Sequence, residues 1–133
     1  MAEIVFCDSD TDKAYELTCG LLEKYPDMDM IVGLNEYSAV GAARAVKEQG
    51  LADSIHMAGI DSSVEQIQLL EEGVYEALAI QKPFNMGYLG VETAEKLLQG
   101  ESVEEYIDSG SELITKENMY TEENQKLLFP VEE

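Results

Sequence analysis

The chain has 133 residues, of which 45% are apolar, so it is long enough for one domain with a modest hydrophobic core. Its 28 acidic and 8 basic residues give a formal net charge of -20, which repels nucleic acid phosphates and anionic membrane surfaces. Direct DNA binding is therefore not expected, and a solvated, soluble surface is the simplest interpretation of the charge.

The N-terminal segment MAEIVFCDSD has neither the basic region nor the long apolar region of a signal peptide. Nowhere does an apolar run approach the roughly 18 residues that a membrane span requires. The two cysteines, Cys7 and Cys19, match no zinc-binding or redox spacing, so we expect two free thiols.

In chain order, the segment EIVFC at 3–7 predicts a first strand, and a helix should follow between Asp12 and Tyr25. The apolar residues of that helix recur at helical spacing: Ala14, Leu17, Leu21 and Leu22. The segment MIVGL at 30–34 then predicts a second, buried strand. A second helix follows it and ends at Gly50, and it carries Ala39, Ala42, Ala43 and Val46 on one face.

The third repeat begins with IHMAGI at 55–60, which predicts a strand. A capping-box pattern from Ser62 to Glu65 predicts the start of the next helix, and Gly73 predicts its end. Its buried stripe should consist of Val64, Ile67 and Leu70. The segment YEALAI at 75–80 predicts a fourth strand.

Alternating strands and helices of this kind indicate an α/β fold, with a three-layer α/β/α arrangement around a parallel sheet covered on both faces. We divide the chain into βα units at 1–81, a linker with a helix at 82–100, and a returning strand with a charged tail at 101–133. Pro83 interrupts the fourth strand, and the linker helix should run from about Gly87 to Gln99.

Polar side chains follow each predicted strand, at the end of a parallel sheet where ligands bind. The candidate ligand-binding residues are Ser9, Asn35, Glu36, Asp61 and Gln81. Amides offer donors together with acceptors, and an ionised carboxylate accepts from paired hydroxyls, which suits a polyhydroxylated ring. The pattern therefore indicates a carbohydrate pocket.

A structural alternative exists for three of these residues. Asn35 and Asp61 each precede a predicted helix and are good N-cap residues, and spacing alone favours capping over ligand contact. Gln81 can equally be a turn residue before Pro83. The residues by themselves leave both interpretations open.

Other chemistries find no support in the chain. His56 has no acidic or cysteine partner at ligand spacing, so we expect no metal site there. The acidic loop of Asp8, Asp10 and Asp12 fits neither a phosphoacceptor nor an EF-hand. No GxGxxG, P-loop or nucleophile elbow is present, so we expect no cofactor and no enzymatic activity.

The segments NEYSAVGAARAVKEQG, SIHMAGIDSS, ALAIQKP and GVETAEKLLQGE occur in the order found in the ribose-type periplasmic binding proteins. Over nearly its whole length, the chain resembles the C-terminal lobe of such a type I sugar receptor of an ABC importer, and it is similar to LacI-type sensor domains. The resemblance implies that Asn35, Asp61 and Gln81 hydrogen-bond the sugar. Glu36 stands where the family has Asp, and Ser9 falls near a position where ribose binders carry a stacking aromatic ring, which leaves the identity of the sugar open.

The resemblance also implies a function and a context. The full protein would be an extracytoplasmic solute-binding component that holds a monosaccharide between two lobes and delivers it to an ABC permease; the alternative is the effector domain of a LacI-type regulator. In the family, a first lobe and an opening βα unit precede this segment. In the two-lobed relatives the 87–99 helix packs on the first lobe. We therefore expect the 133-residue fragment to bind sugar weakly, and either to form a homo-oligomer that covers the apolar face of this helix or to fold the helix back onto its own sheet.

Overall fold

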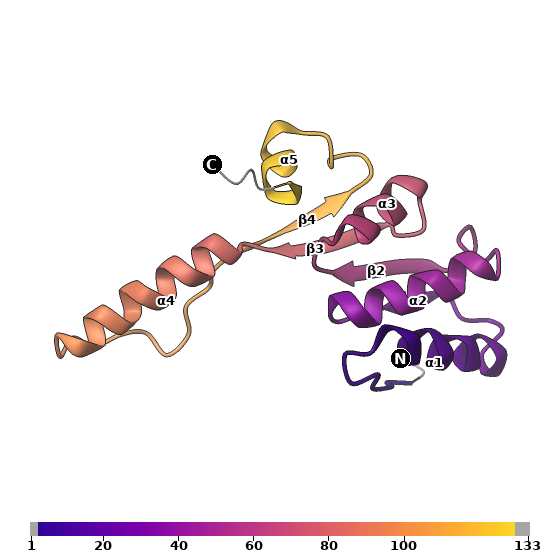
Figure 1. Cartoon of the computed structure of the whole chain (residues 1–133), viewed down its shortest axis with the longest axis horizontal. Helices are drawn as coiled ribbons and strands as arrows, with labels where there is room; N and C mark the ends of the chain where they lie inside the picture. The colour runs from indigo at the N-terminus through magenta and orange to yellow at the C-terminus, as the bar shows by residue number, and fades with distance from the viewer. Residues whose placement is uncertain (1–2, 130–133) are drawn as a thin grey trace.

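The computed structural model of the protein describes residues 3–129, which form five helices and one four-stranded sheet (Figure 1). The elements are α1 (Thr11–Lys24), β1 (Met30–Val32), α2 (Glu36–Glu48), β2 (His56–Ile60), α3 (Val64–Glu72), β3 (Ala77–Gln81), α4 (Pro83–Leu98), β4 (Ser111–Thr115) and α5 (Glu122–Leu128). The strands lie side by side in chain order; β1, β2 and β3 are parallel, and β4 pairs antiparallel with β3. The predicted α/β class is confirmed.

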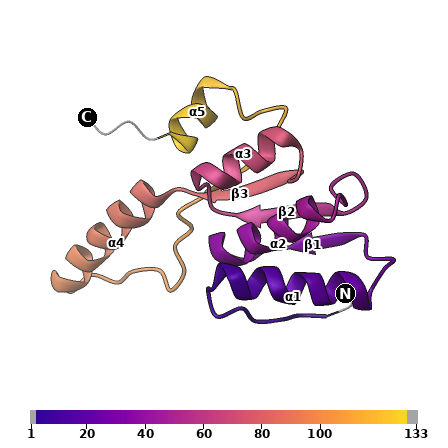
Figure 2. The same cartoon turned by 45° about the vertical axis from the view of Figure 1, so that its right-hand side comes forward.

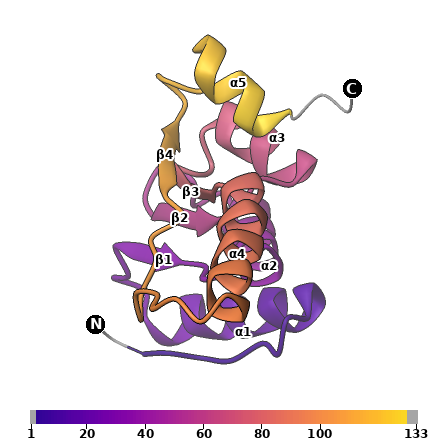
Figure 3. The same cartoon turned by 90° about the vertical axis from the view of Figure 1, so that its left-hand side faces the viewer.

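The helices that cover the sheet lie on one of its faces (Figure 3). Because β1, β2 and β3 follow one another without a reversal, right-handed crossovers place α2 and α3 on the same side. On that side Met57, Leu78 and Ile114 are fully buried. On the other side Met30 and Leu113 are more than half exposed. The expectation of helices on both faces is therefore wrong for residues 3–129.

The first predicted strand does not form. Residues 3–7 are assigned to no strand, and both Ile4 and Phe6 are largely exposed. The next segment does form a strand, but β1 has only three residues and lies at the edge of the sheet with Met30 and Val32 exposed, so the prediction that it is buried was wrong. A strand needs a hydrogen-bonded neighbour, and none of residues 3–129 pairs with the outer edge of β1.

The core lies between the sheet and the layer formed by α2 and α3. In α2, seven residues between Ala39 and Val46 are buried, in agreement with the predicted face. Helix α1 lies alongside α2 (Figure 2). This close approach depends on Gly41, because a Cβ atom there would lie 2.3 Å from the carbonyl oxygen of Thr11 and 2.6 Å from the Cβ atom of Ala14.

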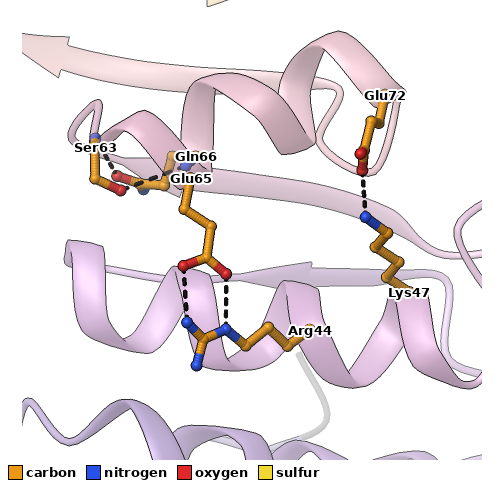
Figure 4. A network of polar contacts seen from close by, with 6 residues as sticks. All are labelled: Arg44, Lys47, Ser63, Glu65, Gln66 and Glu72. Carbon is orange, nitrogen blue, oxygen red and sulfur yellow. Dashed lines mark hydrogen bonds and ion pairs between the residues drawn. The ribbon is translucent and has the colours of Figure 1, made fainter.

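Polar contacts join α2 to α3 across the solvent side of this layer (Figure 4). The Arg44 guanidinium donates two hydrogen bonds of 2.7 Å to the Glu65 carboxylate, and these hold the pKa of Glu65 below its usual value. One turn further along α2, Lys47 pairs with Glu72.

Helix α3 begins and ends close to the predicted positions. It begins one residue later than the capping-box pattern predicted, because Ser63 and Gln66 form the box instead of Ser62 and Glu65. Val64 is exposed and not part of the buried stripe. Gly73 ends α3 in the left-handed conformation, as predicted.

Helix α4 projects from the rest of the molecule and buries none of its residues (Figures 1 and 2). It begins at Pro83 and not near Gly87, because proline is well tolerated in the first turn of a helix. The returning strand is β4, but sequence analysis missed α5, whose Leu128 is buried in the core. Residues 1–2 and 130–133, the latter at the end of the predicted charged tail, lie outside the described residues. Within residues 3–129, none of the helices combines the length and apolar character of a membrane span.

Candidate functional site

The carboxyl ends of the three parallel strands meet at one edge of the sheet, where the arrowheads of β2 and β3 point toward the base of α4 (Figure 1). Asp61 follows β2 directly, and its backbone N–H still donates to the carbonyl oxygen of Ala79 in β3, at 3.1 Å. Gln81 is the last residue of β3, and Asn35 lies three residues beyond β1. The structure therefore places all three predicted ligand-binding residues at the same edge.

Asp61 connects two of the other candidates. Its Oδ1 atom accepts a hydrogen bond of 3.0 Å from Nε2 of Gln81, and its Oδ2 atom accepts one of 3.1 Å from the backbone N–H of Glu36. The latter group is the first N–H of α2, so the carboxylate lies at the positive end of the α2 dipole. Asp61 does not cap its own helix, because Ser63 does.

Asn35 serves as the N-cap of α2. Its Oδ1 atom accepts from the backbone N–H of Ser38 at 2.9 Å, while the Ser38 hydroxyl accepts from the N–H of Asn35 at 3.1 Å. This reciprocal arrangement confirms the capping interpretation for Asn35. The Nδ2 atom of Asn35 takes no part in capping and donates a hydrogen bond of 3.0 Å to the hydroxyl of Ser9. The five candidates therefore form two small groups. Ser9 and Asn35 make up the first group, and Glu36, Asp61 and Gln81 make up the second.

Three non-glycine residues at this edge have left-handed backbone conformations. Asp8, Ser9 and Asp61 have φ values of 56°, 58° and 77°. Such conformations cost free energy in residues other than glycine, and they concentrate at functional sites where the surrounding structure holds them in place. Asp61 directly follows β2 and Ser9 contacts Asn35, so two of the three belong to the group of candidate residues, which supports a specialised role for this edge.

Two cavities lie near the strand ends. A cavity of about 310 Å³ includes Asp61 and Gln81 in its lining, together with Ser62, Ile80, Pro83, Met86, Leu127 and Leu128. A larger one of about 640 Å³ lies at the base of α4, between Lys82, Phe84, Glu112 and α5. None of the five candidates lines the larger cavity, and of the five only Asp61 and Gln81 line the smaller one.

Sequence analysis missed two residues that shape this edge. Ser38 holds Asn35 in place, and the spacing of an N-cap residue to a serine three positions later was the signal for it. Lys13 in α1 forms an ion pair with Asp8 beside Ser9, and this contact raises the pKa of Lys13. No pattern in the sequence predicted that pair, because it depends on the turn at 7–10.

Comparisons with known proteins identify the family of the chain. Residues 2–102 match the family model described as periplasmic binding protein domain. The chain is 31% identical over 110 residues to the ribose import binding protein of Escherichia coli K12, with 83% of this chain and 37% of that protein covered. It is 33% identical over 109 residues to the Haemophilus influenzae ribose import binding protein, again with 37% of that protein covered.

Solved structures show the same relationship. An ABC transporter solute-binding protein from Agrobacterium vitis with bound D-fucose is 32% identical, has a TM-score of 0.85, and is matched over 96% of this chain and 44% of its own. A sugar transporter from Clostridium phytofermentans is 55% identical with a TM-score of 0.71, over 85% of this chain and 40% of its own. The chain thus spans less than half the length of these relatives. From the matching family model and these relatives, we conclude that the chain belongs to the periplasmic binding protein family.

Proposed function

We propose that the chain forms one wall of a sugar-binding cleft and acts in reversible capture of a monosaccharide for an ABC importer, with no covalent chemistry. The observation that carries this proposal is the convergence of Asn35, Asp61 and Gln81 at the carboxyl ends of the parallel strands. Family membership supports it, because the relatives described above are named as sugar-binding or import proteins.

The chemistry of the site supports a polyhydroxylated ligand. The Asp61 carboxylate accepts from two donors, and a pair of sugar hydroxyls offers the same donor geometry to the same oxygens. The Asn35 and Gln81 amides add donors that now bond to Ser9 and Asp61. Sugar binding would exchange these internal hydrogen bonds for bonds to the ligand.

The proposal extends to the complete receptor of which this chain would form one part. A wall from a second lobe would be needed to exclude water from the sugar, so this chain by itself should bind only weakly. The complete receptor would work outside the cytoplasm with a permease. The relatives described above are transport proteins, so they favour this function over the alternative of a LacI-type effector domain. We also propose that the isolated chain self-associates.

Chemical-shift mapping by NMR tests the site. We expect millimolar monosaccharide to shift the side-chain amide signals of Asn35 and Gln81, and Asp61→Ala to weaken binding about tenfold or more, which corresponds to roughly 1 to 3 kcal/mol for a lost buried partner. Gln68→Ala in α3, at an exposed position away from the strand ends, is the matched control and should bind like the original chain. Shifts that appear elsewhere, or that persist unchanged in Asp61→Ala, would contradict this site.

A further inference from the structure

A buried glutamine spans the turn that contains Asp61. Gln66, in the first turn of α3, is 0% exposed, although glutamine is seldom fully buried because its amide must then find partners within the fold. Its Nε2 atom donates a hydrogen bond of 2.8 Å to the carbonyl oxygen of Ile60, and its Oε1 atom accepts one of 3.0 Å from the backbone N–H of Ser63. The side chain therefore bridges the two ends of the turn.

The contact with Ile60 goes beyond ordinary helix capping. In a capping box, the residue at the third helical position accepts from the N–H of the N-cap residue, and either glutamate or glutamine can do this. Figure 4 shows this exchange between Ser63 and Gln66. Only glutamine also offers N–H donors, and here one of them binds the last residue of β2. The residue type at position 66 thus serves the end of the strand as well as the start of the helix.

The peptide unit between Ile60 and Asp61 is held at both of its polar groups. Its N–H, which belongs to Asp61, donates to a carbonyl oxygen of β3 at 3.1 Å, and its carbonyl oxygen accepts from Gln66. Asp61 has a φ of 77°, a left-handed conformation that persists in a residue other than glycine only where the surrounding structure enforces it. From this conformation its carboxylate accepts from Nε2 of Gln81 and from the N–H of Glu36.

We propose that Gln66 is a positioning residue for the sugar site. It holds the peptide unit before Asp61 and the N–H of Ser63 after it, and so keeps the Asp61 carboxylate within reach of its partners. The consequence for ligand binding rests on the proposed function, in which Asp61 accepts from sugar hydroxyls. The effect on the position of Asp61 is measured without sugar, so the two ideas fail separately.

NMR of Gln66→Met tests the positioning role in the absence of ligand. Methionine is as long and as flexible as glutamine, but it removes both hydrogen bonds to the turn. We expect loss of the strong NOE between the amide and α protons of Asp61 that a positive φ produces, together with a shift of the side-chain amide signals of Gln81. A folded Gln66→Met protein in which both signals are unchanged would overturn the proposal.

Two control variants separate positioning from general stability. Ser63→Ala removes the hydroxyl that caps α3 but leaves the Gln66 amide and its two backbone partners in place. Gln125→Met removes a matching contact elsewhere, because Nε2 of Gln125 also donates at 2.8 Å to the carbonyl oxygen of the sixth residue before it, Met119. Both variants should lower the midpoint of urea unfolding and leave the two NMR signals as they are in the original chain. If either control moved these signals as much as Gln66→Met does, the positioning role would be refuted.

A sugar titration of the same variants connects the position of Asp61 with binding. Gln66→Met should weaken the apparent affinity for a monosaccharide about three- to tenfold, the size of one net hydrogen bond, and Gln125→Met should leave it unchanged. Loss of the Asp61 NOE without loss of affinity would refute the connection. If no monosaccharide bound the original chain, the proposed function would fail, and the ligand-free signals would still decide the role of Gln66.

Hydrogen exchange in the unmodified chain gives a readout that does not depend on whether a variant folds. The side-chain amide protons of Gln66 should exchange with solvent at least about tenfold more slowly than those of Gln68, which is exposed in the same helix. Equal exchange rates would show that the turn does not hold the Gln66 amide, and would overturn the proposal.

Discussion

Helices α2 and α4 differ in where their apolar faces find partners. Both carry apolar residues at helical spacing, yet seven residues of α2 are buried and none of α4 is. The partners of α2 are the sheet on one side and α1 on the other, and both come from the same chain. Periodicity therefore specifies a helix and its apolar face, but does not specify whether the chain contains the surface that covers it.

The largest difference in the free energy of unfolding is expected between leucine-to-alanine substitutions in the packed helices and in α4. Leu70→Ala in α3, where the side chain is fully buried, should lower the free energy of unfolding by about 2 to 5 kcal/mol. Leu97→Ala in α4, where the side chain is 56% exposed, should change it by less than about 0.5 kcal/mol. Urea denaturation followed by circular dichroism measures both. An equal loss for both variants would mean that α4 is packed as tightly as α3.

Replacing one glycine in each helix by alanine should change the stability of the protein in opposite directions. Gly41→Ala in α2 should destabilise the protein by about 1 to 3 kcal/mol, because the new Cβ atom would collide with the backbone of α1. Gly90→Ala in α4 meets no atom within 4 Å and should stabilise the helix by up to about 1 kcal/mol. Thermal unfolding of both variants tests this, and a stabilising Gly41→Ala would show that α1 is not held closely against α2.

The smallest effect concerns the ion pair between Arg44 and Glu65. The contact with Arg44 lowers the pKa of Glu65 in the folded state. The pair therefore stabilises the protein at pH values above the pKa that Glu65 has in the unfolded chain. This contribution is lost as the pH falls through the folded pKa of Glu65. Because both side chains are about 40% exposed, we expect at most about 1 kcal/mol. Glu65→Gln should therefore lose stability at pH 7, and the loss should be smaller at pH 3.

The more exposed pair between Lys47 and Glu72 provides the control for this measurement. Glu72→Gln should change stability less than Glu65→Gln at pH 7, because a single ammonium contact is weaker than the two-point contact of a guanidinium. Urea titrations at pH 7 and pH 3 measure both variants. A loss for Glu65→Gln that persists unchanged at pH 3 would show that packing and not charge is responsible.

The sequence predicted most of the elements on the core side of the sheet, because each βα unit there carries its own periodicity and capping residues. The segment 3–7 was mispredicted for the opposite reason: its composition favours a strand, but pairing depends on a neighbour that residues 3–129 do not supply. Helix α5 was missed because its seven residues are too few for a clear period.

The candidate site was predicted in part. That Asn35, Asp61 and Gln81 would share one edge followed from the direction of parallel strands, and the structure places them there. The contacts among them could not be predicted, because they depend on side-chain directions and on the left-handed backbone of Asp61. Spacing predicted capping for Asp61, but that carboxylate binds the first N–H of α2 instead.

The pairing of β3 with β4 has a consequence for the architecture of the chain. Gln81 and Ser111 face each other as the last register pair of the two antiparallel strands, so the whole segment 82–110 departs from the sheet and returns to it at one point. In topological terms, β3 and β4 form a hairpin whose loop has been expanded into an arm that contains α4. The arm can therefore change in length, sequence or partner while the register of the sheet stays the same.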